Sequence, residues 1–525
     1  MAKTLANLFI DYPFSIPARF PEVEVSGIAI DSRSVKAGDL FVAMRGGSLD
    51  GHDYISAAVE RGAAAIVGDR ELAGPSIPYI RLDNPRQALT WLAAALHDWP
   101  ARKLTVIGVT GTDGKTTTCN LIHRILVSAG IRSGMISTVN AIIGDDLLDT
   151  GFHVTTPDAH DVQAYLARMV NAGLTHVVLE TTSHGWSQYR VDACEFDVGV
   201  VTNITHEHLD EHGSYENYRA AKARLFSSLE WTRVKPHGNP RLGVINRDDP
   251  RSFDFLNDHI KVNKIIYGLS EGSDVRAQDI EFSPSGIRFM GNSAKFEMEV
   301  NSKLVGAYNV SNCLAALAAT VHGLGIDPQV AASGIASLEG IPGRMERIDL
   351  GQNFTAIVDF AHTPNALKVA LEAGRTMTTN RVISVFGSAG LRDKEKRRMM
   401  AETSAELADL SVLTAEDPRT ESLDGILEEM AVGARSRGGQ ESINFWKVPD
   451  RGDAIRLALS LARAGDVVLS CGKGHEQSMC FGRTEYPWDD RTAMRAALAD
   501  LLGVTGPKMP YIPSQDKTEA EWLKG

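Results

Sequence analysis

Gly111-Thr112-Asp113-Gly114-Lys115-Thr116-Thr117 is the stretch that decides the expected fold of the middle of this chain. It follows the apolar segment 104–110 and precedes a helical pattern that ends at Gly130. A glycine-rich loop between a strand and a helix binds phosphate. Its glycines admit backbone N–H groups to the phosphate oxygens, and the helix N-terminus adds partial positive charge. The pattern therefore predicts a nucleotide-binding α/β domain.

The polar residues of this loop have distinct expected roles. Lys115 supplies a full positive charge to the outer phosphates, and Thr116 or Thr117 offers a hydroxyl to magnesium. The loop is shorter than the usual G-x-x-x-x-G-K-[ST] pattern, because Val109 stands where that pattern has its first glycine. A chance Gly-Lys-Thr on a surface turn is the alternative, and the flanking strand and helix favour nucleotide binding.

Composition limits the class of protein. The chain has 525 residues, of which 43% are hydrophobic and 23% charged, as in soluble globular proteins. Its net charge of −12 argues against a general nucleic-acid binder, and no apolar run reaches the ~20 residues of a membrane span. The N-terminus lacks a signal-peptide pattern, and the five scattered cysteines are typical of free thiols in a reducing compartment. We expect a cytoplasmic protein.

The chain is too long for a single core, and its patterns change at two places. Residues 1–102 form a first expected domain. From 103 to 340, short Val- and Ile-rich runs alternate with helical patterns, which predicts a parallel sheet covered on both faces. Residues 341–525 repeat this pattern and end in a polar tail. The expected fold class is therefore α/β with three domains.

Four expected strands of the last domain each end at a polar cluster. Ligands bind beyond the carboxyl ends of strands in open parallel sheets. The clusters thus mark a second candidate site, after the strands 355–359, 382–386, 410–414 and 466–470. Arg392 and Arg419 could bind carboxylates in bidentate fashion, and Glu476 could receive an ammonium, as an amino acid substrate requires. Each alone could equally form a surface ion pair of little energetic value.

Several residues of the middle domain could bind a metal. Glu180 ends a strand near the phosphate loop and could hold magnesium or pair with a neighbouring base. His206, His208 and His212 could form a zinc site. Alternatively, they are solvated side chains of a loop, or one of them completes the coordination of magnesium. Lys222 lies in a clear helical pattern, and from composition alone it is a solvated lysine.

The ordered motifs resemble those of the Mur ligases of peptidoglycan synthesis, in particular the members that add the third residue of the peptide. The resemblance covers nearly the whole chain, from Asp31 to Arg491. The matching motifs are Asp31–Arg33, Gly111–Thr117, Thr155–Pro157, Ser183–Gly185, His208–Asp210, Ala220–Lys222, Gly306–Asn309, Gly343–Glu346, Asp359–Pro364 and Gly472–Glu476.

The resemblance implies a fold, a reaction and a setting. The fold has an N-terminal UDP-MurNAc-binding domain, a central P-loop ATPase with a parallel sheet and a C-terminal Rossmann-like domain. ATP converts the D-glutamyl carboxylate of UDP-MurNAc-L-Ala-D-Glu into an acyl phosphate. The amine of a diamino acid then forms the amide, with release of ADP and phosphate. The implied protein is a cytoplasmic monomer that acts on small molecules, without nucleic acid or a membrane span.

The resemblance also assigns residues to ligands by position. UDP-MurNAc-peptide contacts are expected from Ile30, Ser32, Arg33, Thr155, Thr156, Ser183, Gln188 and Arg190. ATP contacts are expected from Gly111, Thr112, Gly114, Lys115, Thr116, Thr117, Asn309, Arg344, Asp359 and His362. Two magnesium ions are expected on Thr116, Glu180, His208 and Lys222, the last as a carbamate formed with carbon dioxide. Lys115, His208 and Lys222 are the expected catalytic residues, so the resemblance replaces the solvated interpretation of Lys222.

The pocket for the incoming amino acid is expected from Arg392, Glu416, Asp417, Pro418, Arg419, Gly472 and Glu476. The members that add diaminopimelate have Asp-Asn-Pro-Arg where this chain has Glu416-Asp-Pro-Arg419. The retained Arg419 favours meso-2,6-diaminopimelate. Asp417 in place of Asn, and Leu391 in place of a common Asp, favour L-ornithine or L-lysine. Diaminopimelate is the preferred prediction.

Three other functions remain as alternatives. A folylpolyglutamate synthetase is disfavoured by Asp31–Arg33, and a non-enzymatic nucleotide-dependent assembly partner by the retained Arg392, Arg419 and Glu476. A zinc protein would require stoichiometric metal on the three histidines.

Overall fold

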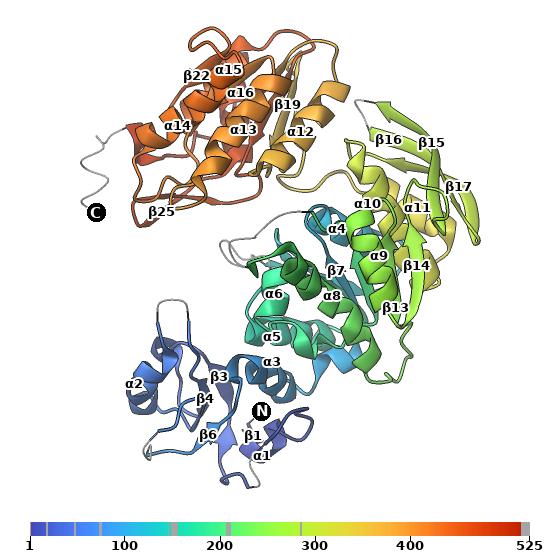
Figure 1. Ribbon diagram of the computed structural model, residues 1–525, viewed down its shortest axis with the longest axis vertical. Coiled ribbons are helices and arrows are strands. Elements are labelled where there is room, and N and C mark those ends of the chain that lie inside the picture. The colour runs from blue at the N-terminus through green and yellow to red at the C-terminus, as the bar shows by residue number, and fades with distance from the viewer. Residues whose placement is uncertain are drawn as a thin grey trace. The chain divides into compact units, whose positions relative to one another are not determined.

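The computed structural model describes residues 2–16, 19–46, 49–72, 76–144, 146–148, 156–205, 212–283 and 286–515 (Figure 1). The chain divides into two compact units. The first comprises Met1–Arg276, Asn292–Phe296 and Asn312–Gly334, and the second comprises Ala277–Gly291, Glu297–Ser311 and Ile335–Gly525. Three of the expected site positions, Thr155, His206 and His208, lie outside the described residues.

A four-stranded parallel sheet forms the N-terminal part of the first unit, in the order β3-β4-β5-β6. Its strands are β3 (Gly27–Ala29), β4 (Asp39–Val42), β5 (Ala65–Gly68) and β6 (Tyr79–Arg81). Helix α3 (Pro85–Leu96) starts with Pro85, and the Asn84 side chain accepts a hydrogen bond from the backbone N–H of Gln87. Its apolar face packs against one side of the sheet, together with α1 (Leu5–Leu8). The other side packs against α2 (Ile55–Glu60). The short strands β1 (Lys3–Thr4) and β2 (Glu24–Val25) pair antiparallel.

The central sheet has eleven strands in the order β10-β9-β8-β11-β7-β12-β13-β14-β15-β16-β17. Seven neighbouring strands are parallel: β8 (Ser133–Ile136), β11 (His176–Glu180), β7 (Thr105–Thr110), β12 (Val198–Val201), β13 (Leu242–Asn246), β14 (Asn263–Tyr267) and β15 (Val275–Ser283). The remaining strands are β9 (Ala141–Ile143), β10 (Asp146–Leu148), β16 (Gly286–Ser293) and β17 (Phe296–Ser302). All six residues of β7 are buried, as expected for a parallel strand covered on both faces.

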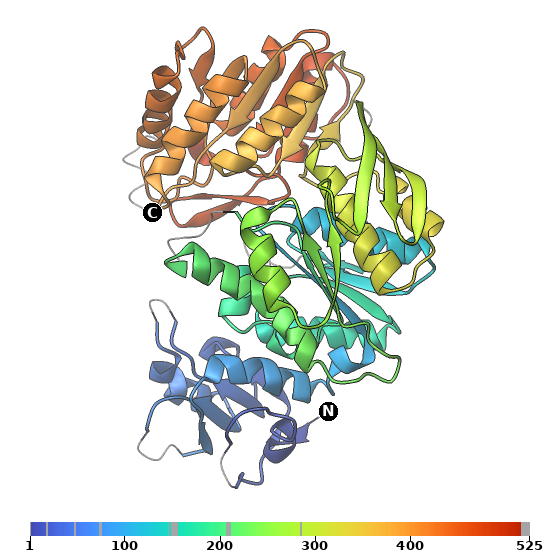
Figure 2. The same cartoon turned by 45° about the vertical axis from the view of Figure 1, so that its right-hand side comes forward.

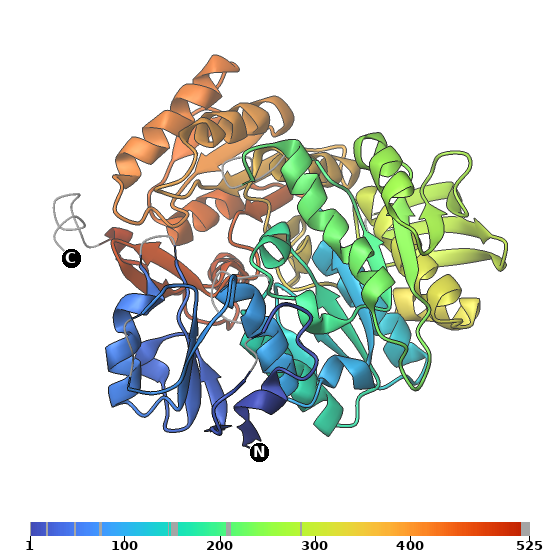
Figure 3. The same cartoon turned by 60° about the horizontal axis from the view of Figure 1, so that its bottom comes forward.

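Helices cover both faces of this parallel region. Gly199 of β12 faces Leu225 of helix α8, whereas its neighbour Val198 lies close to Gly323. Successive strand residues point to opposite faces, so these contacts place two helical layers on the sheet. Helices α8 and α9 lie side by side in one layer (Figure 3). Besides α1, α2 and α3, the described helices of the first unit include α4 (Lys115–Ser128), α5 (Ala159–Asn171), α6 (Ser183–Ser187), α8 (Tyr215–Trp231), α9 (Pro250–His259) and the π-helical turn Ala318–Gly323. Helices α10 (Tyr308–Leu317) and α11 (Pro328–Ala336) each span the unit boundary.

A six-stranded sheet in the order β18-β19-β23-β20-β21-β22 organises the second unit. The edge strand β18 (Glu346–Ile348) is antiparallel to β19 (Thr355–Asp359). The others are parallel: β19, β23 (Val467–Cys471), β20 (Val382–Phe386), β21 (Leu410–Leu413) and β22 (Phe445–Lys447). A hairpin of β24 (Ser478–Phe481) and β25 (Thr484–Pro487) follows. The expected strands of this region are confirmed to within one residue at each end.

Two hydrophobic clusters flank this sheet. Ile357 belongs to the cluster with α12 (Pro364–Thr376), α13 (Lys394–Leu407) and α14 (Leu423–Ser436), which lie side by side in Figure 2. The next residue, Val358, belongs to the cluster with α15 (Arg451–Leu461) and α16 (Asp490–Leu502). The expected α/β class is therefore confirmed, with helices on both faces of the parallel strands.

Two further expectations concern the whole chain. All five cysteines are free thiols, as expected. Within the part of the chain that the structure describes, no helix is both long enough and apolar enough to cross a bilayer.

Candidate active site

The phosphate loop connects β7 to α4 and is braced by the segment that follows β12. Asn203 accepts a hydrogen bond from the Thr112 N–H at its backbone oxygen (2.7 Å) and from the Asp113 N–H at its Oδ1 (3.0 Å). The Thr202 hydroxyl donates to the Asp113 carbonyl at 2.5 Å. These contacts hold the loop against the end of the neighbouring strand.

The two loop glycines are required by close approach. A Cβ at Gly111, whose φ is +152°, would lie 1.9 Å from Thr202 Oγ1. A Cβ at Gly114, whose φ is +80°, would lie 2.4 Å from Asn312 Oδ1. Gly114 is the N-cap of α4 and has no side chain with which to cap this helix end, so the first N–H groups are suited to bind an anion. Lys115 folds back over the loop, and its Nζ donates to the Thr112 carbonyl at 2.7 Å. The loop thus has the cradle that a nucleotide phosphate requires.

Glu180 lies beside the loop at the end of β11, with 1% of its surface exposed. Its carboxylate accepts hydrogen bonds from the Thr116 hydroxyl at 3.0 and 3.1 Å. It also accepts from the Thr138 hydroxyl at 2.8 Å and the Thr138 N–H at 3.0 Å. A threonine hydroxyl and a carboxylate beside a phosphate loop are the hard oxygen ligands that magnesium prefers. These donor types fit the expected metal, and Thr138 is a partner that the sequence did not reveal.

Lys222 is buried, contrary to the solvated interpretation that composition favoured. It lies on α8 with 2% of its surface exposed, and its Nζ donates to the Gly111 carbonyl at 2.5 Å. The same Nζ lies 4.5 Å from the ring centroid of Tyr218, whose hydroxyl is 3.1 Å from Thr112 Oγ1. The lysine therefore points at the phosphate loop.

The residues expected to contact the UDP-MurNAc peptide fall into two groups. Around the end of β11, Arg190 donates to the Thr156 carbonyl at 2.6 Å and to Gln188 Oε1 at 2.7 Å. The Thr156 hydroxyl lies 3.1 Å from that of Thr182, which caps the helix that begins at the buried Ser183. Burial lowers the pKa of Arg190.

The second group follows strand β3 in the N-terminal sheet. Ser32 is buried, and Asp31 accepts a hydrogen bond from the Arg33 N–H and pairs with its guanidinium at 2.7 Å. The Arg33 side chain is 86% exposed, and Ile30 is half-buried. This segment is therefore accessible to a ligand at its arginine.

In the second unit, the expected ATP-contacting residues gather around Phe360. Asp359 ends β19 and accepts from the N–H groups of Met345 (2.7 Å) and Ala361 (2.9 Å), and burial raises its pKa. The Arg344 guanidinium lies 4.6 Å from the Phe360 ring centroid. His362 lies 2.9 Å from the Phe360 carbonyl through Nδ1, and burial lowers its pKa to about 3, so the imidazole is neutral.

Asn309 is buried in the same unit. Its amide donates to the Val305 carbonyl at 2.7 Å.

The expected amino-acid pocket lies where β21 and β23 end. Glu416 follows β21 and is buried, and a Cβ at Gly472 would lie 2.2 Å from its Oε2. Among the described residues this Oε2 has no hydrogen-bond partner. Burial raises the pKa of Glu416 to about 7, although nearby Lys396 and Arg451 oppose the shift. A buried acceptor without a donor is suited to receive one from a ligand.

The backbone of this pocket is strained. Asp417 and Arg419 have φ of +43° and +54°, and Leu391 in the facing loop has φ of +56°. The Gly390 N–H donates to the Asp417 carbonyl at 2.9 Å, and the Arg419 side chain donates to the Gly390 carbonyl at 3.4 Å. Non-glycine residues in this conformation cluster at functional sites, where the surrounding structure maintains them.

The Asp417 carboxylate points into the protein. It pairs with Lys473, whose Nζ is 3.1 Å from both of its oxygens, and it accepts from the Cys480 N–H at 2.9 Å. Lys473 also pairs with Glu476 at 2.5 Å, and the exposed Arg392 lies on the loop that precedes α13. Lys473 lies inside the Gly472–Glu476 motif, but no local pattern singled it out as a functional residue.

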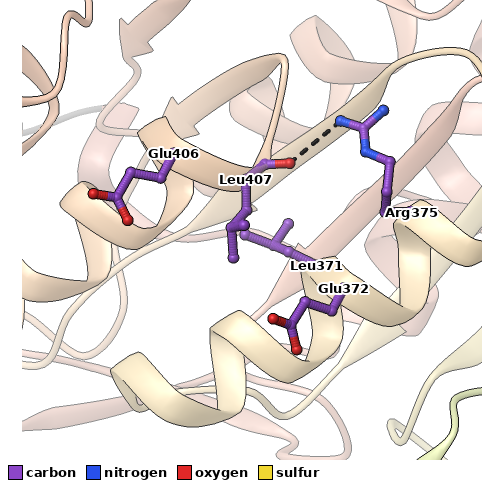
Figure 4. Close-up of a pocket in the computed structure, with 5 residues that line it drawn as sticks. All are labelled: Leu371, Glu372, Arg375, Glu406 and Leu407. Carbon is purple, nitrogen blue, oxygen red and sulfur yellow. Dashed lines mark hydrogen bonds between the residues drawn. The ribbon is translucent and has the colours of Figure 1, made fainter.

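A cavity of about 330 Å³ between α12 and α13 is separate from these residues (Figure 4). Its lining residues are Leu371, Glu372, Arg375, Glu406 and Leu407. Arg375 donates to the Leu407 carbonyl at 3.3 Å and pairs with Asp409 at 2.6 Å, so its charge is already matched.

The fold and the loop define an α/β protein of the P-loop nucleotide-binding class. Family models match along the chain: the Mur ligase family catalytic domain over 24–97, the Mur ligase middle domain over 109–320, and the Mur ligase glutamate ligase domain over 343–474. The UDP-N-acetylmuramyl-tripeptide synthetase of Roseiflexus sp. (strain RS-1) is 41% identical over 495 residues, covering 92% of this chain and 97% of that protein.

Two further relatives agree. The UDP-N-acetylmuramoyl-L-alanyl-D-glutamate–2,6-diaminopimelate ligase of Geobacillus thermodenitrificans is 40% identical over 91% of this chain and 95% of its own. A solved structure of a ligase with the same name is 30% identical, with a TM-score of 0.67, and covers 96% of this chain and 100% of that one. The chain belongs to the Mur ligase family and is therefore an ATP-dependent, amide-forming enzyme.

The loop geometry generates a prediction with a matched control. Gly114→Ala and Gly130→Ala both place alanine at positive φ, at a cost of about 1–2 kcal/mol, but only the first meets another atom within 4 Å. We expect Gly114→Ala to weaken ATP binding by about tenfold or more, because the loop or the buried Asn312 that packs against it must shift. Gly130→Ala should bind ATP as the unchanged protein does. Isothermal titration with ATP and magnesium measures both, and equal affinities for the two variants would contradict the role of the loop.

Proposed function

We propose that this enzyme joins meso-2,6-diaminopimelate to UDP-MurNAc-L-Ala-D-Glu with consumption of ATP, in cytoplasmic peptidoglycan precursor synthesis. The main support is the presence of Arg419 in a pocket at the strand ends, in a chain that matches 2,6-diaminopimelate ligases over nearly their full length. Arginine is the side chain best suited to bidentate binding of the distal carboxylate of this substrate.

We propose three domains with the boundaries 1–102, 103–340 and 341–525, for UDP-MurNAc, for ATP and for the amino acid. The enzyme is proposed to act as a monomer on small molecules. Magnesium fits the Thr116 and Glu180 oxygens beside the phosphate loop, and when bound it neutralises the charge of the transferred phosphoryl group. His208 remains a predicted ligand outside the described residues.

The proposed reaction has two steps. The D-glutamyl carboxylate attacks the γ-phosphorus, the bond to the ADP oxygen breaks, and an acyl phosphate forms. The reacting ammonium loses a proton, and the resulting amine attacks the acyl carbon. The C–N bond forms, the C–O bond to phosphate breaks, and phosphate and a proton from the nitrogen are released. Lys115 and the N–H groups at the start of α4 stabilise the phosphate charge in the first step. Glu476 and Glu416 are proposed to hold the ammonium groups of the amino acid.

L-Lysine or L-ornithine is the second candidate, because Asp417 replaces the Asn of the diaminopimelate type. The pairing of Asp417 with Lys473 weakens this alternative, since the carboxylate is already matched by a buried cation. Diaminopimelate therefore stays the favoured substrate.

Amide formation is the first prediction from this function. We expect the purified enzyme with ATP, magnesium and UDP-MurNAc-dipeptide to form an amide with meso-diaminopimelate at a kcat/KM about tenfold or more above that for L-lysine or L-ornithine. Mass spectrometry of the three product mixtures measures this directly. ATP turnover without an amide from any of the three would contradict the proposed ligase activity, and preference for lysine or ornithine would replace the proposed substrate.

Lys222 provides the second prediction. As a carbamate, this side chain would become an acidic oxygen group beside the phosphate loop, able to face magnesium, because its Nζ already lies against Gly111. We expect Lys222→Ala to lower kcat by about 100-fold or more, with partial recovery on addition of short carboxylates.

The exposed Lys261→Ala is the matched control and should leave kcat unchanged. The melting temperature of each variant separates loss of fold from loss of activity. A Lys222→Ala enzyme with full activity, or one that no carboxylate restores although it is folded, would count against the carbamate.

A further inference from the structure

Lys473 is a completely buried lysine that joins two acidic residues of the candidate amino-acid pocket. It lies two residues beyond strand β23, and none of its side chain is exposed. Its Nζ is 3.1 Å from both oxygens of Asp417 and 2.5 Å from Glu476 Oε2. Burial lowers the pKa of Lys473, but Glu476 and Asp417 together raise it above its ordinary value, so the lysine is charged.

The two acids differ in their surroundings. Asp417 is 6% exposed, and its oxygens are taken up by Lys473 and by the Cys480 N–H. Arg419, two residues after Asp417, also binds Cys480: the Arg419 N–H donates to the Cys480 carbonyl at 3.1 Å. Asp417 therefore anchors the Glu416–Arg419 turn to β24, with its charge matched inside the protein.

Glu476 lies closer to solvent. Its side chain is 20% exposed, and its N–H donates to the Lys473 carbonyl at 2.9 Å in a tight turn. One ammonium thus faces two carboxylates, and Glu476 is the more exposed of the two. A pocket of this kind can receive an ammonium at Glu476 without presenting a second acid at Asp417.

We propose that Lys473 is a positioning and specificity residue of the amino-acid pocket. It fixes the Glu476 carboxylate and cancels the charge of Asp417, so that Arg419 can select the distal carboxylate of the incoming amino acid without an opposing charge from Asp417. The inference rests on the proposed function, because it requires an amino acid in this pocket.

Two substitutions separate the two effects. Lys473→Met leaves a buried unpaired carboxylate at Asp417 and releases Glu476. We expect the KM for diaminopimelate to rise about tenfold or more, and the ratio of kcat/KM for diaminopimelate over L-lysine to fall by a similar factor. The KM values for ATP and UDP-MurNAc-dipeptide should stay within about twofold. Asp417→Asn preserves shape and should change the substrate ratio by less than about threefold, since the removed charge was already cancelled.

The double variant Asp417→Asn with Lys473→Met should recover most of the substrate ratio, because the unpaired acid is gone. Lys447→Met is the matched control: Lys447 also pairs with two glutamates, at 2.7 and 3.4 Å, but its side chain is 28% exposed and lies outside the pocket. It should leave every constant unchanged. Melting temperatures and ATP binding report whether each variant is folded.

The outcomes are distinct. A folded Lys473→Met enzyme with the wild-type KM for diaminopimelate and the wild-type ratio of kcat/KM values would overturn the inference. The proposed ligase activity would not be affected by that result. If Lys473→Met does not fold, Asp417→Asn still tests the inference. A tenfold change in the ratio of kcat/KM for diaminopimelate over L-lysine would show that the charge of Asp417 faces the substrate uncancelled, and would overturn the inference. If the wild-type enzyme forms no amide with any of the amino acids, the proposed function is overturned, and the inference with it.

Discussion

The buried carboxylate of Glu180 is the constraint on which the phosphate site depends. An acid with 1% exposure is stable only when hydrogen bonds replace its hydration. Its donors are the Thr116 hydroxyl at the start of α4 and the hydroxyl and N–H of Thr138, which follows β8. The carboxylate thereby links the ends of two parallel strands to the first turn of the phosphate-binding helix. The same oxygens that link these elements are those that a hard cation would use.

A second buried charge has a comparable role in the other unit. The guanidinium of Arg451 pairs with Asp490 at 2.6 Å and donates to the carbonyls of Ala415 and Cys471, the residues that directly precede Glu416 and Gly472. Asp490 is also satisfied by the Trp488 indole N–H at 2.8 Å and the Ser470 hydroxyl at 2.9 Å. A fully hydrogen-bonded buried pair fixes geometry more than it adds stability. Here it holds two chain segments of the amino-acid pocket in register.

Sequence was sufficient for the fold class, for most strands and for the phosphate loop, because each has a strong local signal. Val-Ile runs such as 382–386 are strands within a residue of the expected bounds, and the glycines of the loop are required where they were expected. Periodicity predicted the helix that contains Lys222 but not which neighbour that side chain meets, which a long-range contact to Gly111 decides.

The details of the amino-acid pocket could not be read from the sequence for the same reason. The pair of Asp417 with Lys473 joins residues 56 positions apart, and nothing local signals the positive φ of Arg419. From the sequence alone, Asp417 is an unpaired negative charge, which favours a substrate that ends in an amine. With that pairing, the charge is matched inside the protein. Residue types predict chemistry, whereas the direction of a side chain depends on tertiary packing.

In the proposed reaction, ATP is spent on one carboxylate of the precursor. Oxygen transfer tests it most directly, with UDP-MurNAc-L-Ala-D-Glu labelled with ¹⁸O in the D-glutamyl side-chain carboxylate. If an acyl phosphate forms and the amine displaces phosphate from it, one labelled oxygen appears in the inorganic phosphate, detected by mass spectrometry or by the isotope shift in the phosphorus NMR spectrum. Amide formation with unlabelled phosphate would contradict the account.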